Sequence, residues 1–503
     1  MPKYLLGIDN GATVTKAALF TAGGEELAVA SRKTEMLTPQ PGHTERDVED
    51  LWQATAGAIR AVLERARIDP IDIACIATAG HGNGLYLLDG QGKPVYNGII
   101  STDSRAKDYI ARWTQQGLPG KILHKTTQCI WPAQPNALLA WIRDNQPQVL
   151  KNTRWVLMCK DYIRFRLNGQ IHAEMTDYSG TSLMNVVTGR YDDEVLEAFG
   201  IGEMRDLLPP LVRSEEICGE VTAEAAAETG LAQGTPVCGG LFDIDACALS
   251  SGIVEPGQLC MISGTWGNNQ YICNEPVVSE DVFMTSRYCI PGYYLILEGS
   301  ATSASNLEWF VTQFFEAERE AAEARGESVF DLCNRAVAAT EPGESNIVFL
   351  PFLFASNADA DASAALVGMG GWHGRGHVLR AIYEGVVFGH KTHVNKLLKF
   401  RDMPKTIQLT GGAARSEVWV QIFADVFQVP VEIPAGTELG ALGAAICAAV
   451  GAGIYPSYPD AVKAMVKIAR VQQPNAANKD LYDEKYQRYR KVIDALGAVW
   501  KDF

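Results

Sequence analysis

Gly7-Ile8-Asp9-Asn10-Gly11-Ala12-Thr13 decides the fold, because an apolar strand here runs into a turn of small residues with a carboxylate at its tip. Two similar stretches follow far along the chain, Ile262-Ser263-Gly264-Thr265 and Thr410-Gly411-Gly412-Ala413 with Ser416. Such turns expose N–H groups and hydroxyls that suit phosphate oxygens, and small residues let the backbone approach closely. Asp9 could reach a phosphate-bound Mg²⁺. The order predicts an ATP site with two phosphate turns and a third turn for the nucleoside.

The size and composition of the chain narrow the class of protein. With 503 residues, the chain is expected to form two domains. A formal net charge of −15 argues against a general nucleic-acid or anionic-membrane binder. Eleven cysteines, an odd number without a C-x-x-C pair, are typical of reduced thiols in a cytoplasmic protein. The longest nearly uncharged stretch, 439–455, is predicted to be a closely packed helix rather than a membrane span.

The predicted elements alternate between strands and helices. Strands are expected at 4–8, 15–20 and 27–30, a helix over Thr44–Arg67 with Thr44 at its start, and a further strand at 71–77. A second series of alternating strands and helices is expected to begin near Gly257. This order predicts an α/β fold of two actin-like (ribonuclease H-like) ATPase lobes with a cleft between them. The expected lobes are residues 1–247, with the sugar site and the first phosphate turn, and residues 248–503, with the second phosphate turn and the adenosine site.

Six stretches in a fixed order carry a family resemblance. They are Gly7–Lys16, Lys160–Arg164, Gly239–Asp243, Gly264-Thr265, Arg380–Gly385 and Thr410–Asp425. Together they resemble the FGGY family of carbohydrate kinases over essentially the whole chain. Within that family, four stretches look most like bacterial L-xylulose (3-keto-L-gulonate) kinases, although erythritol and other polyol kinases share some of these loops. These stretches are Gly80–Leu85 with Leu87-Leu88-Asp89, Gly240–Asp243, Ser305–Phe310 and Phe349–Leu353.

The resemblance implies ATP- and Mg²⁺-dependent phosphorylation of a sugar or polyol hydroxyl, such as O5 of L-xylulose or 3-keto-L-gulonate. It makes Asp243 the general base that takes the proton from the attacking hydroxyl. A carboxylate after the apolar run Pro236–Phe242 would be costly to bury without a task or a partner. The alternative is that Asp243 caps the helix that follows, although Asp245 could serve that cap instead.

The nucleotide and metal ligands are expected in both lobes. The residues expected at the ATP site are Asp9, Gly11, Thr13, Lys16, Gly264, Thr265, Glu308, Gly411, Gly412, Ala413 and Ser416. Asp9 and Asp243 are the expected Mg²⁺ ligands, although Asp9 could instead form a turn with Asn10-Gly11. Ala12 stands where the family commonly has Thr, so one hydroxyl is lost. Trp419 and the helix Arg380–Gly385 are expected to be structural, and Gly440–Ala445 to pack closely under the adenosine site.

The sugar site is implied mainly by the resemblance. His81 and Asn83 lie where related kinases hold polyol hydroxyls, and Asp103 with Arg105 matches the family's Asp-x-Arg position. Trp131 could form the aromatic wall that a polyhydroxy substrate needs. These residues could instead be surface polar groups of loops. Gly82-Asn83 replaces the Arg-Glu pair of glycerol kinases, so glycerol is not an expected substrate.

Two rivals from other classes remain open. The first is an actin/Hsp70-type ATPase that acts as a chaperone or filament, and the second is an inactive sugar sensor, which Ala12 permits. A P-loop kinase is excluded, because G-x-x-x-x-G-K-[ST] is absent from the sequence. We expect a cytoplasmic homodimer that binds a small-molecule sugar or polyol, with no nucleic-acid or membrane partner.

Overall fold

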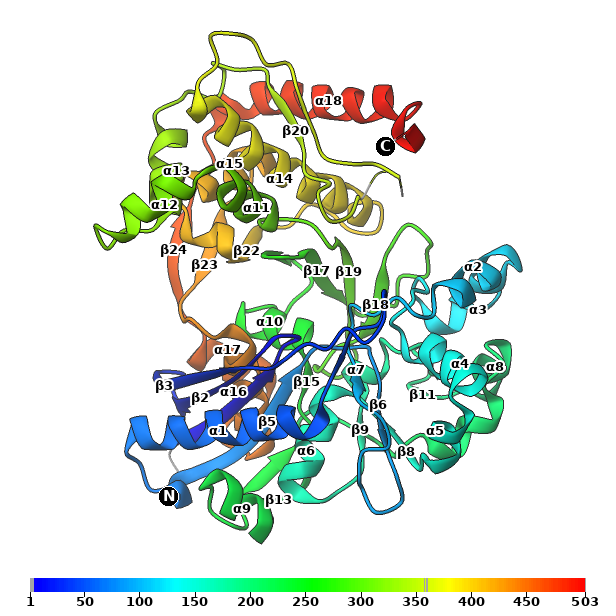
Figure 1. Cartoon of the computed structure of the whole chain (residues 1–503). Coiled ribbons are helices and arrows are strands. Elements are labelled where there is room, and N and C mark those ends of the chain that lie inside the picture. Colours follow the sequence, from blue (N-terminus) through cyan, green and yellow to red (C-terminus); the bar gives the residue numbers. More distant parts are fainter. Residues whose placement is uncertain (1–3, 357, 359–360, 503) are drawn as a thin grey trace. The chain divides into compact units, whose positions relative to one another are not determined.

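The computed structural model describes residues 4–356, 358 and 361–502, and the chain forms two compact units. Unit 1 comprises Met1–Val254, Ile272–Ile296 and Gly436–Lys467; unit 2 comprises Glu255–Tyr271, Leu297–Ala435 and Ile468–Phe503. Each unit is an α/β structure, as predicted (Figure 1). The compact units do not follow one cut at 247/248, because two segments of the second half belong to unit 1. That boundary remains a prediction about the sequence domains.

The main sheet of unit 1 has the order β13–β14–β5–β1–β2–β3, with β15 also paired to β5. The first three strands form antiparallel hairpins, whereas β1, β14 and β15 each run parallel to β5. The strands of unit 1 are β1 (Tyr4–Asn10), β2 (Val14–Thr21), β3 (Glu26–Lys33), β4 (Glu45–Arg46), β5 (Ile73–Gly80), β6 (Tyr86–Leu88), β7 (Gly98–Ile99), β8 (Trp155–Leu157), β9 (Ala173–Glu174), β10 (Met184–Asn185), β11 (Arg190–Tyr191), β12 (Leu211–Val212), β13 (Ile217–Glu220), β14 (Pro236–Cys238), β15 (Leu241–Phe242) and β18 (Met284–Arg287).

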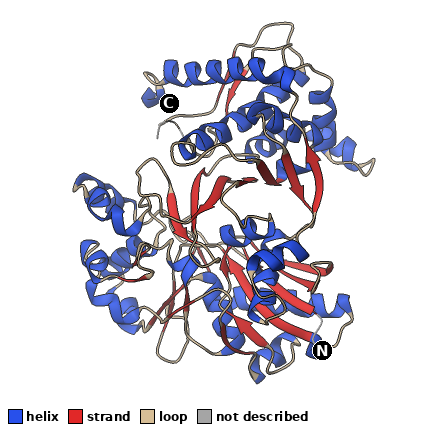
Figure 2. Cartoon of the chain, turned by 180° about the vertical axis from the view of Figure 1, so that it is seen from behind, coloured by secondary structure: helices blue, strands red, loops and turns tan. Residues whose placement is uncertain are grey.

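Helices cover this sheet and build a second core beside it (Figure 2). The helices of unit 1 are α1 (Val48–Ala66), α2 (Lys107–Gln115), α3 (Leu118–Thr126), α4 (Pro135–Asn145), α5 (Pro147–Asn152), α6 (Cys159–Asn168), α7 (Met175–Tyr178), α8 (Asp193–Ala198), α9 (Ala223–Thr229), α10 (Asp243–Ser250), α16 (Leu439–Gly451) and α17 (Tyr458–Met465). The second core joins side chains of α2, α3, α4 and α8 to those of β6–β8.

Strand β1 uses its two faces differently, because successive side chains of a strand point to opposite sides. Leu6 and Ile8 pack with Trp52 and Ile59 of α1 in one hydrophobic core. Gly7 faces α16, where an added Cβ would overlap the carbonyl of Ala441. The glycine therefore permits the close approach of α16 to the strand that carries Asp9.

Helix α1 begins later than its sequence predicts. Asp47 is the N-cap and accepts hydrogen bonds from the N–H groups of Glu49 and Asp50, so the helix starts at Val48 rather than Thr44. Glu45 and Arg46 instead form strand β4, which pairs with β7. The predicted helix was correct in its apolar face but wrong at its start, because a two-residue strand leaves no periodic signal.

The sheet of unit 2 repeats the arrangement of strands seen around β1. Strand β16 pairs antiparallel with β17 and parallel with β22, and β22 runs parallel to β23. The strands are β16 (Gln258–Ser263), β17 (Gly267–Cys273), β19 (Tyr294–Ser300), β20 (Val348–Leu350), β21 (Ala365–Val367), β22 (Thr406–Gly411), β23 (Val431–Pro434) and β24 (Ile468–Gln472), of which β17 and β19 extend into segments of unit 1. The helices are α11 (Ser305–Phe314), α12 (Glu316–Glu323), α13 (Val329–Ala338), α14 (Arg375–Leu397), α15 (Glu417–Phe427) and α18 (Lys479–Leu496).

The apolar stretch 439–455 forms a helix of thirteen residues, α16, followed by a turn. Ten of its residues are buried, which confirms the prediction of a closely packed helix. Among the described residues, no helix combines the length and the apolar character that crossing a membrane requires.

Candidate active site

Three neighbouring parallel strands of unit 1 end at one edge of the sheet. Asn10 of β1 is the register partner of Gly80 in β5, and Gly80 is in turn the partner of Phe242 in β15. The backbone N–H of His81 donates to the carbonyl of Asn10 at 3.0 Å. Ligands of open α/β sheets bind outside the carboxyl ends of the strands. Asp9, His81 and Asp243 therefore lie together where a ligand is expected.

Asp243 is the first residue of α10 and remains partly accessible to solvent. Burial of its carboxyl by protein atoms, together with the charge of Asp9, raises its pKa to about 8, although the N–H of Ile244 lowers it. The N-cap of α10 is Phe242, which has no side-chain capping bond. Asp245 does not cap the helix either, because it is the third residue of α10, which has no side-chain capping bond; burial raises the pKa of its carboxyl well above the usual range.

Asp9 lies against the N-terminal turn of α16. Burial raises its pKa to about 6; Lys16 lowers it and Glu438 raises it. A Cβ atom at Gly440 would overlap Asp9 Oδ2, so a larger residue there would displace the carboxylate from this position. Lys16, which was predicted to neutralise phosphate charge, forms an ion pair with Glu438 at 2.7 Å. That role of Lys16 remains a prediction, and it requires phosphate to compete with Glu438.

The small residues of α16 pack against the elements of unit 1 that carry Asp9 and Asp243. At Gly443, an added Cβ would overlap the carbonyl of Ala246 in α10. With Gly440 against Asp9, the helix touches the elements that carry both carboxylates. The prediction of close packing was correct, and the described partners of these glycines are Asp9 and Ala246; a position under the adenosine site remains a prediction.

The first phosphate turn is closed by a hydrogen bond from the Gly11 N–H to the Val14 carbonyl at 3.0 Å. Thr13 is exposed, so its hydroxyl is accessible to a ligand. Behind the turn, Nη2 of Arg46 donates to the carbonyls of Gly11, at 3.2 Å, and Ala12. Sequence reasoning missed Arg46, because the predicted helix 44–67 made it an ordinary surface residue.

Arg46 is buried without a counter-charge. Within the described part of the chain no carboxylate forms a salt bridge with it, and its Nε and Nη1 have no hydrogen-bond partner. Burial of an unpaired charge is costly. The guanidinium is therefore a fixed positive charge beside the turn, and it also helps burial to lower the pKa of His81 to about 3.

His81 and Asn83 form a short loop against the strand that leads to Asp243. The His81 ring is neutral at this pKa, and its Nε2 lies 3.1 Å from the Tyr86 hydroxyl. Asn83 adopts a left-handed backbone with φ of 60°, and its Oδ1 is buried without a partner. A Cβ atom at Gly82 would overlap the Phe242 ring. The loop thus holds two polar side chains next to the end of β15.

Trp131 is the aromatic side chain predicted as a wall of the sugar site. Its ring packs edge to face with Phe283, with centroids 6.1 Å apart. The residue is half-buried, so part of its surface is accessible. Its contact with a sugar remains a prediction.

Asp103 and Arg105 use their polar atoms within the protein. Arg105 Nε donates to Asp103 Oδ1 at 2.9 Å, and its Nη2 donates to both Asp103 and Glu45 at 2.8 Å. Asp103 Oδ2 also accepts the N–H of Thr44 at 2.7 Å. The guanidinium lies over the Trp141 ring, 5.1 Å from its centroid. This closed network fastens the loop to the segment before α1, and a direct sugar contact from either residue remains a prediction.

In unit 2, the second phosphate turn and the nucleoside turn lie side by side. Ser263 of β16 is the register partner of Gly411 in β22, so Gly264-Thr265 and Gly412 follow neighbouring strand ends. Gly411 has φ of 87°, and an added Cβ would overlap the Ser263 carbonyl. The glycine at this position is therefore required for the two turns to approach.

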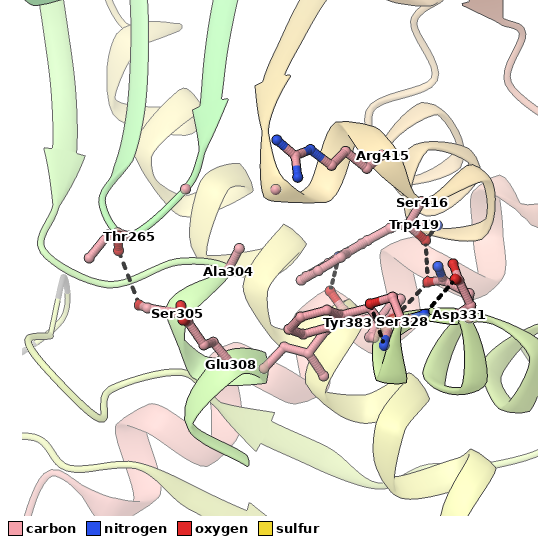
Figure 3. A pocket seen from close by; sticks show the side chains of 15 residues that line it. Thr265, Ala304, Ser305, Glu308, Ser328, Asp331, Tyr383, Arg415, Ser416 and Trp419 are labelled. Carbon is pink, nitrogen blue, oxygen red and sulfur yellow. Dashed lines mark hydrogen bonds between the residues drawn. The ribbon is translucent and has the colours of Figure 1, made fainter. Parts of the chain in front are cut away.

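These turns border a cavity of about 470 Å³ (Figure 3). The residues that line it are Gly264, Thr265, Ala304, Ser305, Leu307, Glu308, Ser328, Phe330, Asp331, Asn334, Tyr383, Gly412, Arg415, Ser416 and Trp419. Five predicted ATP-site residues are among them, namely Gly264, Thr265, Glu308, Gly412 and Ser416. Gly411 and Ala413 do not line it, and Ala413 is fully buried. Their direct contact with a nucleotide remains a prediction.

An aromatic pair forms one side of the cavity. The rings of Tyr383 and Trp419 stack with centroids 4.2 Å apart, and Trp419 Nε1 donates to the Tyr383 carbonyl at 3.0 Å (Figure 3). Both residues are almost fully buried and also border the cavity, so the expectation that Trp419 and the helix 380–385 are structural stays a prediction. Their apolar spacing on two helices is also that of ordinary core residues, so it gave no signal of a cavity.

Ser416, which was predicted to contact ATP, makes two hydrogen bonds within the protein, and its contact with a nucleotide remains a prediction. Its Oγ accepts the Trp419 N–H at 3.2 Å as the N-cap of α15, and donates to Asn334 Oδ1 at 2.6 Å. The hydroxyl is therefore engaged within the protein, although the residue lines the cavity. Asn334 of α13 was not predicted, because α13 shows only the pattern of an amphipathic helix.

Two carboxylates of unit 1 are the candidate ligands for a divalent cation. Among the described residues, no group of three or more histidine, cysteine, aspartate or glutamate side chains could hold a metal by itself. Asp9 and Asp243 nevertheless lie close enough for the charge of one to raise the pKa of the other. Mg²⁺ is usually held by one or two carboxylates together with substrate phosphates. These two carboxylates fit that pattern.

Two family profiles match the chain: the N-terminal domain of the FGGY family of carbohydrate kinases over residues 4–250, and its C-terminal domain over residues 259–452. The L-xylulose/3-keto-L-gulonate kinase of Escherichia coli is 39% identical over 99% of this chain and 98% of its own. A probable L-xylulose kinase of Pasteurella multocida is 36% identical over 99% of both chains. The crystal structure of xylulose kinase from Rhodospirillum rubrum, at 28% identity, covers 99% of this chain and 100% of its own, with a TM-score of 0.89.

Proposed function

Because the chain belongs to the FGGY family of carbohydrate kinases, we propose that it transfers the γ-phosphoryl group of ATP to a hydroxyl group of a ketose, with Asp243 as the general base. The observation that carries this assignment is the position of Asp243 at the end of β15, partly accessible and beside His81 and Asp9. A carboxylate with a pKa near the working pH is well suited to accept a proton.

The proposed reaction begins with the sugar bound at the strand ends of unit 1. The amide of Asn83, whose Oδ1 has no partner, offers hydrogen bonds to sugar hydroxyls, neutral His81 would do so by exchanging its contact with Tyr86 or Gly82, and Trp131 offers an apolar face. Asp243 accepts the proton of the attacking hydroxyl, whose oxygen forms the new bond to the γ-phosphorus while the bond to the β-phosphate bridging oxygen breaks. ADP leaves with that oxygen. Positioning and electrostatic stabilisation supply most of the acceleration in such transfers.

The phosphate contacts are assigned to the glycine turns. Thr13 with the N–H groups of the first turn, and Thr265 with those of the second, are proposed to donate to phosphate oxygens. Arg46, which donates to the carbonyls of Gly11 and Ala12, is proposed to keep these two acceptors turned from the phosphate. The cavity of unit 2 is proposed to take the base and ribose, with Glu308 accepting from ribose hydroxyls.

Mg²⁺ is proposed to be held by Asp9, by Asp243 and by ATP phosphates. When bound, it neutralises phosphate charge and favours the ionised forms of both carboxylates, which lowers their pKa values.

The names of the relatives support the choice of sugar. We propose L-xylulose or 3-keto-L-gulonate as the substrate, phosphorylated at O5, because relatives at 39% and 36% identity carry these names. We also propose a cytoplasmic location and a homodimeric state.

A coupled assay of ADP release tests the proposal against L-xylulose, 3-keto-L-gulonate, D-xylulose, L-ribulose and erythritol. We expect turnover that depends on the sugar and has the highest kcat/KM with one of the first two. ATP hydrolysis that is indifferent to every sugar would favour an actin/Hsp70-type ATPase instead. Sugar binding without ADP formation would indicate a sensor, and preference for erythritol would reassign the substrate.

A further inference from the structure

Asn334 has one half of its side-chain amide fixed by two hydroxyls. Its Oδ1 accepts hydrogen bonds from the Tyr383 hydroxyl at 2.8 Å and from Ser416 Oγ at 2.6 Å. A carbonyl oxygen has two lone pairs, so this acceptor is fully used. The amide therefore cannot offer an acceptor to a ligand in the cavity that it lines.

The two hydroxyls are themselves held in place. Ser416 Oγ accepts the Trp419 N–H, so its hydrogen is left to donate to Asn334. The Tyr383 ring stacks on Trp419, whose indole N–H bonds the Tyr383 backbone (Figure 3). Three helices, α13, α14 and α15, thus fix the orientation of one amide group.

The other half of the amide is unused. Within the described residues, no acceptor takes a hydrogen bond from Asn334 Nδ2. Asn334 is half-buried and belongs to the lining of a cavity of about 470 Å³. A fixed group with two N–H donors and no acceptor can recognise an unprotonated ring nitrogen, and it disfavours a protonated one.

We propose that Asn334 Nδ2 donates a hydrogen bond to an unprotonated ring nitrogen of the adenine base, and that it is a binding residue for the nucleotide base. The inference rests on the proposed function, because it takes the cavity to be the base site. Adenine offers N1, N3 and N7 as acceptors of this kind. Tyr383 and Ser416 act through Asn334 as positioning residues.

Asn334→Asp tests the donor directly, because it keeps the shape and an oxygen for both hydroxyls. It replaces Nδ2 by an oxygen that faces the nitrogen lone pair. We expect the KM for ATP to rise about 30-fold, with the sugar KM and the kcat at saturating ATP within about threefold of wild type. Asn334→Ala should raise the ATP KM about tenfold. Asn145→Asp, on an exposed turn of α4, is the matched control and should leave the ATP KM, the sugar KM and kcat unchanged.

Deaza analogues of ATP identify the acceptor. For wild type, kcat/KM should be about tenfold lower with one of 1-deaza-, 3-deaza- or 7-deaza-ATP than with ATP. For Asn334→Ala, kcat/KM should be the same with that analogue as with ATP. Such non-additivity is the signature of a direct contact. Penalties that persist unchanged in Asn334→Ala for all three analogues would overturn the inference, as would an ATP KM within twofold of wild type for Asn334→Asp.

ADP binding by calorimetry separates this inference from the proposed function. Wild type that binds ADP, together with an Asn334→Asp variant that binds it equally well, would overturn only the assignment of Asn334. Wild type that does not bind ADP would overturn the nucleotide site and this inference together. Weaker ADP binding by Asn334→Asp with an unchanged unfolding temperature is the result expected.

Discussion

Asp243→Asn should stabilise unit 1 at alkaline pH, because a half-buried carboxylate is costly to ionise there. Burial and Asp9 raise the pKa of Asp243 from 3.8 to about 8. Between these values the folded chain holds a proton that the unfolded chain has released, so stability falls as the pH rises. The difference of about four pKa units, at about 1.4 kcal/mol per unit, gives a ceiling of about 6 kcal/mol.

The asparagine carries no charge, so the variant should escape this pH dependence. Between pH 5.5 and 8.5 its advantage over wild type should grow by about 3 kcal/mol, or about 6 °C at about 2 °C per kcal/mol. The assay is scanning calorimetry without Mg²⁺ or nucleotide, because either ligand would stabilise the ionised form. Asp480→Asn is the control, since its side chain is 98% exposed and should show no such trend. If the unfolding temperatures of wild type and Asp243→Asn change in parallel with pH, the claim that the carboxyl of Asp243 is desolvated is refuted.

Three further variants test other parts of the site. Gly440→Ala should lower kcat at least tenfold, because its Cβ overlaps Asp9; Gly371→Ala, where a Cβ meets open space, is its control, and equal activity would contradict the packing argument. Arg46→Gln should lower kcat/KM for ATP about tenfold, with partial recovery in Arg46→Lys, whereas an effect on stability alone would make the residue structural. Trp131→Ala should raise the ketose KM about fivefold and leave the ATP KM unchanged; a normal ketose KM would remove Trp131 from the sugar site.

The strands and their turns could be predicted because the signal is local. The apolar run that ends at Asp9 and the run that ends at Ser263 both became strands followed by antiparallel partners. The pairing of Gly80 with Phe242 could not be read from the sequence, since parallel strands are joined by long crossovers. The relation between His81 and Asp243 therefore rested on the resemblance until the sheet register was known.

The missed residues share a physical cause. Asn334 lies on an amphipathic helix and Tyr383 on a helix that is buried all round over residues 379–390, and in both helices a cavity-lining residue has the same pattern as a core residue. Arg46 lies on a strand of two residues that the helix pattern concealed. Asp103 and Arg105 matched a motif, but a motif does not tell whether its charges face a ligand or each other, and here they pair within the protein.

The central claim is that Asp243 activates the sugar hydroxyl, and the most direct test is the turnover of Asp243→Ala with ATP, Mg²⁺ and the preferred ketose. We predict that sugar phosphate formation falls by at least three orders of magnitude, while the Kd for ADP stays within threefold of wild type. Sugar phosphate formation by this variant at a rate within tenfold of wild type would contradict the assignment.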